Sequence, residues 1–190
     1  MKSMQSRGLG LVGVAVLAGL LGTGCATNIR KPAMAPAPTE VKLSTFKQYI
    51  LKPVAIAPAF SASSANQKAC RKIETELFAQ LSMALPGLEK AEADGAAAPK
   101  GKRVLVIEPV IEEIKFIGGF ARFMVGGMAG SSAVLMKVTF LNSETGKVVA
   151  EPEFYRAANG MGGGYSIGAT DNLMLDQIAQ DIALYAKMNL

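Results

Sequence analysis

The feature that most constrains the fold is an alternation of apolar and polar residues between positions 136 and 140, with Val134 in the same phase. Successive side chains of a strand point to opposite faces, so the alternation places all the apolar side chains on one face. The apolar positions are Val134, Met136, Val138 and Phe140, and they alternate with Lys137 and Thr139. Residues 142–146 then supply a turn that ends in glycine, and residues 148–155 are expected to return as the second strand. The sequence therefore predicts a hairpin with one face covered by another layer.

Two segments have the helical spacing of apolar residues that such a layer requires. The first runs from position 63 to 87, with a capping box of Ser64 and Gln67 at its start and Pro86-Gly87 at its end. The second covers residues 170–189, where Thr170 or Asp171 is expected to cap the helix. The apolar stripes are Ala69, Ile73, Leu77, Leu81 and Ala84 in the first helix, and Leu175, Ile178, Ile182 and Tyr185 in the second. Both helices are expected to face a core.

The remaining strands complete the predicted fold class. Residues 49–60 form an almost continuous apolar run, which predicts a strand covered on both faces. Residues 104–118 are strand-like throughout, with a bend or bulge at Glu108-Pro109, because proline cannot donate to a ladder. Residues 88–103 are expected to be a surface loop, and a short edge strand over residues 88–92 is the alternative. The order predicts an α+β two-layer domain, with two helices packed on a mixed, mostly antiparallel sheet.

The first 24 residues have the features of a bacterial lipoprotein signal peptide. Lys2 and Arg7 precede an apolar and glycine run over residues 8–21, and small residues follow it. At ~1.5 Å per residue this run spans about 21 Å, too short for a hydrocarbon core of ~30 Å. The run leads into Cys25, which resembles the lipidated first residue of mature lipoproteins, although Gly22 stands where such signals usually place leucine. A conventional cleavage site next to a free or disulfide-bonded Cys25 is the alternative.

Acyl chains on Cys25 are expected to anchor the protein to a membrane. In such lipoproteins an Asp after the cysteine commonly signals inner-membrane retention. Ala26 stands there instead, so the resemblance implies the outer membrane of a Gram-negative bacterium, facing the periplasm. Residues 25–44 are rich in proline and alanine, which predicts a semi-extended tether, and roughly 18 such residues could reach ~55 Å. Residues 45–190 are then expected to form a single periplasmic α+β domain.

The composition excludes several kinds of chemistry. The chain has no histidine, so neither a Ser/His/Asp triad nor a Cys/His pair can be built, and the commonest zinc ligand is missing. We expect no metal site, no cofactor and no catalytic residue. A net charge of +5 without a cluster of basic residues gives no indication of nucleic-acid binding. Ser44 and Lys47 match S-x-x-K, but no apolar helix follows to present them. Cys70 is expected to be buried, with an intermolecular disulfide as the alternative.

Two glycine-rich segments, residues 117–132 and 156–170, do not fit a simple element. Each contains five glycines, and neither matches a nucleotide-binding motif. Both adjoin the hairpin, so we expect them to lie near each other, where loops on a rigid scaffold often carry recognition. The candidate partner-binding residues are Phe120, Arg122, Phe123 and Tyr165. For Arg122 the alternative is a salt bridge to Glu112 or Glu113. The spacing of Gly126 and Gly130 is also compatible with a segment that touches the membrane.

The stretches GGFARFMVGGMAG and VTFLNSETGKVV, with the distal ANGMGGGYSIG and IAQDIALY, resemble the bacterial domain-of-unknown-function family 4410 over most of residues 49–188. The resemblance implies an exported, often lipidated protein and supplies no catalytic residue. The leading hypothesis is therefore a non-catalytic outer-membrane lipoprotein that binds or scaffolds another cell-envelope component. A second is an oligomeric, pore- or secretion-associated lipoprotein that uses residues 117–132 for membrane or self contact. A third is an enzyme that uses carboxylates or a Ser/Lys pair.

Overall fold

The computed structural model describes residues 29–91, 103–117, 131–158 and 169–190. In these residues seven strands form one mixed sheet of order β3-β1-β4-β5-β6, in which β2 also pairs with β4 and β7 with β5. The strands are β1 (Gln48–Leu51), β2 (Ala55–Ile56), β3 (Leu88–Lys90), β4 (Val104–Lys115), β5 (Ala133–Asn142), β6 (Val148–Ala150) and β7 (Glu153–Ala157). The pairs among β1, β2, β3 and β4 are parallel, and the pairs made by β5 are antiparallel.

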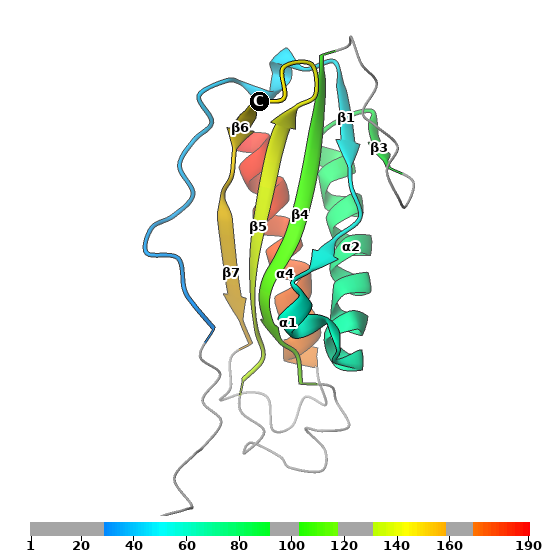
Figure 1. Ribbon diagram of the computed structural model, residues 1–190, viewed down its shortest axis with the longest axis vertical. Helices are drawn as coiled ribbons and strands as arrows, with labels where there is room; N and C mark the ends of the chain where they lie inside the picture. Colours follow the sequence, from blue (N-terminus) through cyan, green and yellow to red (C-terminus); the bar gives the residue numbers. More distant parts are fainter. Residues whose placement is uncertain (1–28, 92–102, 118–130, 159–168) are drawn as a thin grey trace, which may run out of the picture.

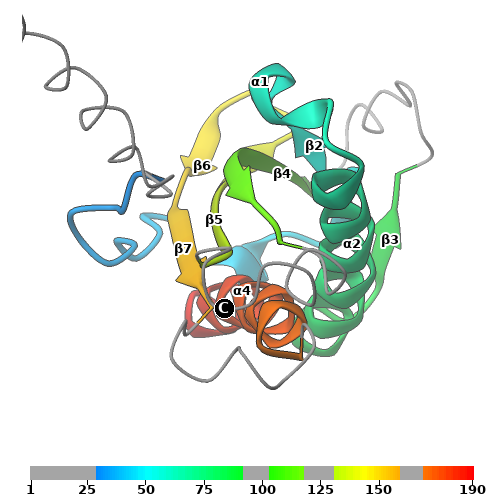
Figure 2. The same ribbon diagram turned by 90° about the horizontal axis from the view of Figure 1, so that it is seen from below.

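Two long helices cover one face of this sheet. The helices of the described residues are α1 (Pro58–Ser61), α2 (Ser64–Ala84) and α4 (Ala169–Met188), with a 3-10 turn η1 (Leu43–Thr45) before β1. Figure 1 shows α2 and α4 behind the sheet, and Figure 2 shows them side by side on the inner side of its curve. The expected α+β architecture of helices packed on a mixed sheet is confirmed.

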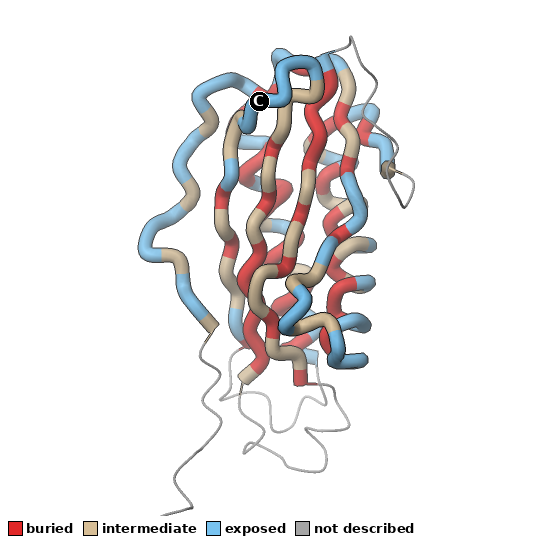
Figure 3. The backbone as a smooth tube through the Cα atoms, in the orientation of Figure 1, coloured by how far each residue is buried: buried red, intermediate tan, exposed pale blue. Residues whose placement is uncertain are grey.

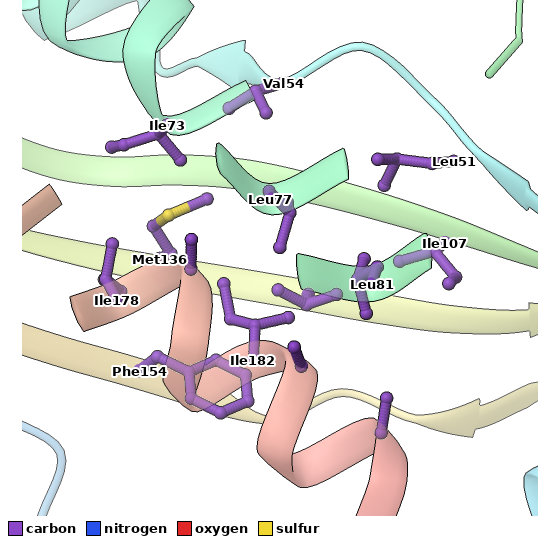
Figure 4. Packing of buried hydrophobic residues seen from close by; sticks show 14 of the residues in the cluster. Leu51, Val54, Ile73, Leu77, Leu81, Ile107, Met136, Phe154, Ile178 and Ile182 are labelled. Atoms are coloured by element: carbon purple, nitrogen blue, oxygen red, sulfur yellow. The ribbon is translucent and has the colours of Figure 1, made fainter. Parts of the chain in front are cut away.

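The core lies between the sheet and these two helices. Figure 4 shows Ile73, Leu77 and Leu81 of α2 meeting Ile178 and Ile182 of α4 over the sheet. All five side chains are fully buried. Burial of apolar surface contributes about 25 cal/mol per Å² and is the main stabilising term for such a layer. The helical stripes read from the sequence are therefore the core-facing stripes, apart from the half-buried Ala84 at the end of α2.

The predicted hairpin is also confirmed. The four apolar positions of β5 are fully buried, whereas Lys137 and Thr139 between them are partly exposed. Gly146 closes the turn with a φ of +69°, a left-handed conformation that glycine adopts without steric cost. The return chain is interrupted at Glu151 and Pro152, so it forms two strands, β6 and β7.

The bulge of β4 lies beyond the Glu108-Pro109 position that the sequence indicated. Pro109 pairs with Val138 of β5, whose N–H donates to the Pro152 carbonyl on the other side. On its second side Pro109 faces the gap between β1 and β2. The missing donor of proline therefore costs no ladder hydrogen bond, and the irregularity in register falls between Ile111 and Glu113 instead.

The single strand expected over residues 49–60 is wrong. The chain forms β1, breaks, forms the short β2, and then begins α1 at Pro58. Proline suits the first turn of a helix, because its fixed φ is helical and its missing N–H has no partner there. Burial alternates along β1, and Ala55 of β2 is exposed, so this segment is not covered on both faces.

The helix starts differ slightly from the predicted ones. The N-cap of α2 is Ser63, whose Oγ accepts a hydrogen bond from the Asn66 N–H at 3.4 Å. The capping box of Ser64 and Gln67 is therefore wrong by one residue. Residues 170–171 lie inside α4, which begins at Ala169, so neither is its N-cap. The alternative prediction of a short edge strand over residues 88–92 is confirmed, because β3 lies there.

Candidate functional site

The residues chosen from the sequence as functional lie outside the described part of the chain. These are the lipidation residue Cys25 and the candidate contact residues Phe120, Arg122, Phe123 and Tyr165. The structure does describe the strand ends from which the two glycine-rich segments leave the sheet. Lys115 of β4 pairs with Ala133 of β5, which pairs in turn with Ala157 of β7. Both segments are therefore attached to the same end of the sheet, which we call the Lys115 end.

The clearest feature of the described surface is the N-terminal strap, defined here as residues 29–43. The strap runs along the domain beside β7 and α4 and is mostly exposed (Figures 1 and 3). Its last residue, Leu43, is fully buried in the core. Part of the segment expected to be a free tether is therefore fastened to the domain, and the reach of ~55 Å calculated for a free chain does not apply to it.

Hydrogen bonds to Tyr185 near the end of α4 and to Asn189 just past it hold the second half of the strap. The Tyr185 hydroxyl donates to the Ala37 carbonyl at 2.9 Å. The Thr39 N–H donates to Asn189 Oδ1 at 2.7 Å, and the Leu43 N–H donates to the Asn189 carbonyl at 2.8 Å. Asn189 is itself fixed, since its Nδ2 donates to the Tyr185 carbonyl at 2.7 Å. Asn189 thus connects two points of the strap to the helix.

Arg30 fastens the first half of the strap to a group of carboxylates on β4 and β7. Its guanidinium donates to both carboxylate oxygens of Glu153, at 2.8 and 2.6 Å, and to Glu112 Oε2 at 3.1 Å. Its backbone N–H donates to Glu113 Oε2 at 3.0 Å. Adjacent strand residues normally point to opposite faces, but the irregularity next to Glu112 lets both glutamates reach Arg30. Arg30 is a partner of this pair, and the salt bridge expected for Arg122 lies outside the described residues.

Glu153 and Arg30 shift each other's pKa. The hydrogen bond from Arg30 lowers the pKa of Glu153 below its ordinary value, and the nearby Lys137 adds to this effect. The bond to Glu153 raises the pKa of Arg30 in turn. Lys137 also lies 3.7 Å from Glu112 and 3.4 Å from Glu151. The lowered pKa of Glu153 favours its ionised form beside Arg30, and this ion pair favours a docked strap.

A cavity of about 620 Å³ lies between the strap, β7 and α4. This volume is in the range of small-molecule sites. The rings of Phe154 and Tyr185 meet edge to face, with centroids 5.7 Å apart, at the wall formed by the domain. Met34 of the strap and Leu184 and Met188 of α4 line the cavity with largely exposed side chains. Such an apolar part of the lining suits an apolar or extended segment.

Charged groups border the same cavity. Arg156 Nη2 donates to Asp181 Oδ1 at 2.6 Å, and this contact raises the pKa of Arg156. The Lys31 ammonium lies 5.4 Å from the centre of the Tyr155 ring, within the range of a cation–π contact. These groups are positioned to orient a polar end of a bound segment.

The other residues considered for chemistry lie apart from this cavity. Ser44 and Lys47 are both exposed near η1. Cys70 is buried, as expected, and its Sγ lies 3.4 Å from the Val54 carbonyl. Burial raises the pKa of Cys70 to about 11. Within residues 29–91, 103–117, 131–158 and 169–190, no three potential metal ligands of the Asp, Glu, Cys or His type cluster together.

None of the helices in the described ranges combines the length and the apolar character needed to cross a bilayer.

The strap contacts could not be found from local patterns. Arg30 is 123 positions from Glu153, and Thr39 is 150 positions from Asn189, so no local spacing marks either pair as a contact. The available signal was weak: Met34 is a large apolar residue, and Arg30 and Lys31 are charged, within a segment otherwise rich in proline and alanine.

Comparison with known proteins gives one family and several distant structures. A family model described as a domain of unknown function (DUF4410) matches residues 37–161. No curated protein matches the sequence at a significant level.

Three solved structures illustrate the structural likeness. The PelC dodecamer from Paraburkholderia phytofirmans is 12% identical, with a TM-score of 0.44 over 77% of this chain and 91% of its own. Protein XCC0632 from Xanthomonas campestris is 9% identical, with a TM-score of 0.49 over 82% and 94%. Lipoprotein GNA1162 from Neisseria meningitidis is 16% identical, with a TM-score of 0.40 over 70% and 99%. Lipoproteins and an oligomer thus occur among the neighbours, but likeness this distant carries no conclusion about the activity or assembly of this chain.

Proposed function

The chain belongs to the DUF4410 family of domains of unknown function, and from that premise we propose that it is a non-catalytic lipoprotein of the outer membrane. Residues 1–24 are the signal peptide, and Cys25 carries the acyl chains. The domain faces the periplasm and binds or scaffolds another component of the cell envelope.

The observation that carries this proposal is the sequence around Cys25. A basic start, an apolar run and small residues precede the cysteine, as in a lipoprotein signal. Ile29, four residues later, begins the part of the chain that lies along the domain. A lipid at Cys25 would thus be joined directly to a folded domain, and two or three acyl chains would hold it at a bilayer permanently.

A binding role is supported by where the glycine-rich segments attach. Lys115, Ala133 and Ala157 are register partners, so the segments that contain Arg122 and Tyr165 leave the sheet together. Two loops on the same end of a rigid sheet are a common basis for recognition. The absence of histidine from the sequence removes the usual general base and favours binding over catalysis.

Lipidation is tested with globomycin, which blocks processing of lipoprotein precursors. We expect the treated cells to accumulate a larger precursor, and we expect the untreated protein to have an intact mass that includes fatty acid on Cys25. The Cys25→Ser variant should lose both properties, and Cys70→Ser serves as the matched control. A mature wild-type protein without fatty acid would refute the anchor.

Partner binding is tested by photo-crosslinking in intact cells. A photoreactive amino acid at Arg122 or Tyr165 should capture a defined envelope component, whereas the same group at Glu144, in the exposed turn at the opposite end of the sheet, should not. Equal capture from all three positions would contradict a binding surface at the Lys115 end. A ladder of self-crosslinks from residues 117–132, with an oligomer in detergent, would instead support the oligomeric, secretion-associated alternative.

A further inference from the structure

The strap follows the long axis of the domain. From Arg30 to Leu43 it has thirteen residue steps, which span about 40 Å in an extended proline-rich chain. The ten residues of β5 span about 34 Å at 3.4 Å each. The strap is therefore long enough to run the length of the sheet, as Figure 1 shows.

The two ends of the strap are attached at different levels of the sheet. Arg30 binds Glu112 and Glu113, which lie within three residues of Lys115, the last residue of β4. Leu43 binds Asn189, just past the end of α4. Figure 1 places that end of α4 beside the opposite end of the sheet, near the β5–β6 turn. The strap thus runs from near the Lys115 end toward the turn that contains Glu144.

The covalent chain limits how far Cys25 can lie from the fastened strap. Four residue steps lead from Cys25 to Ile29, and at no more than ~3.6 Å per residue they span at most about 14 Å. A free tether from Cys25 to Ser44 would span several times that distance. Fastening of the strap therefore replaces a long tether with a short one that emerges nearer one particular end of the domain.

We infer that the strap fixes the orientation of the domain on a lipid surface, with the Lys115 end toward the bilayer and the Glu144 turn away from it. This inference rests on the proposed lipidation of Cys25. The contacts of Arg30 and Asn189 position the anchor, and the exposed Leu173 in the first turns of α4 lies on the half that is brought toward lipid. The Lys115 end then lies next to the membrane, and the opposite end of the sheet, with the Glu144 turn, faces the periplasm.

The experiment measures energy transfer from two labelled positions to the membrane. Ala157→Cys places a donor dye at the Lys115 end, and Glu144→Cys places it at the opposite turn; both positions are exposed. Acylated Cys25 cannot react, and Cys70 is buried, so only the introduced thiol is labelled. The lipidated full chain is reconstituted in phosphatidylethanolamine–phosphatidylglycerol vesicles that carry a headgroup acceptor. The two sites lie beside opposite ends of β5, whose ends are nine residue steps apart, so the Ala157→Cys donor should lie about 30 Å closer to the acceptor plane.

Releasing the strap should remove this difference. The double variant Arg30→Glu/Asn189→Ala loses attachments at both ends of the strap, and Lys147→Glu, at an exposed position, is the control of equal charge change. We expect the double variant to show nearly equal transfer from both sites, while Lys147→Glu keeps the wild-type difference. Circular dichroism verifies that each variant is folded. The single variant Arg30→Glu releases only the first half of the strap and serves as a second, milder test.

The outcomes separate this inference from the proposed function. Equal transfer from both sites in the wild-type chain, with fatty acid present and vesicles bound, overturns the orientation and leaves the lipoprotein proposal intact. A difference that persists in the folded double variant overturns the role of the strap. A wild-type chain that carries no fatty acid and does not float with vesicles overturns the proposed function, and the inference with it.

Discussion

Removal of the Asn189 side chain gives the sharpest test of the strap. In Asn189→Ala, the Thr39 N–H loses its acceptor at 2.7 Å, and the Thr39 hydroxyl loses the same acceptor at 3.2 Å. Asn189 is only 9% exposed, so water restores these bonds poorly. At about 1 kcal/mol net for each bond, docking of this part of the strap should weaken by about 2 kcal/mol. A change of this size corresponds to a roughly 30-fold larger population of the undocked state.

Limited trypsin digestion of the mature protein in detergent measures this population. The bond after Lys42 precedes Leu43, which is buried and hydrogen-bonded, so cleavage there requires local opening. We expect cleavage after Lys42 to be about 30-fold faster in Asn189→Ala than in the wild type. Cleavage after exposed lysines elsewhere in the chain should proceed at the same rate in both proteins. Lys187→Ala, at an exposed position in the last turn of α4, should cleave like the wild type. A rate for Asn189→Ala that matches this control would refute the argument that Asn189 holds the strap.

Three further predictions concern the core, the carboxylate cluster and the thiol. Leu81→Ala should lower the free energy of unfolding by about 2–5 kcal/mol in urea titrations, because Leu81 is fully buried; Met83→Ala, at a 72% exposed residue of the same helix, should change it by less than about 0.5 kcal/mol. The lowered pKa of Glu153 stabilises the fold above the unfolded value of about 4.3. This contribution is lost as the pH falls through the lower folded pKa, so thermal melts of Glu153→Gln should lose less stability in acid than those of the wild type. Cys70, with a pKa of about 11, should react with a maleimide at neutral pH only after unfolding.

Each of these has a result that contradicts it. Equal losses for Leu81→Ala and Met83→Ala would mean that the α2 stripe is not the core face. Parallel acid profiles for Glu153→Gln and the wild type would mean that the contact with Arg30 does not stabilise the native protein. Rapid labelling of native Cys70 would contradict its burial beside Val54.

The candidate site was less predictable from the sequence than the elements around it. The sequence placed the glycine-rich segments on either side of the hairpin, and register pairing of Lys115, Ala133 and Ala157 shows that their attachment points share one end of the sheet. The cavity beside Tyr185 depends on the strap, and a proline-rich segment reads as a free linker when its partners are distant in the chain. The contact residues chosen within the glycine-rich segments stay predictions.

The sequence by itself determined the elements whose signal is periodic. The alternation in β5 and the apolar stripes of α2 and α4 predict strand and helix correctly, because side-chain direction repeats every two residues in one and every 3.6 in the other. Only the tertiary structure decided that Pro109 sits within β4 in continuous register, because its missing donor faces the gap between β1 and β2. It alone also showed that Arg30 reaches Glu112, Glu113 and Glu153, and that Asn189 holds Thr39. Such contacts join residues that are far apart in the chain, and the local spacing of residues carries no record of which distant groups will meet.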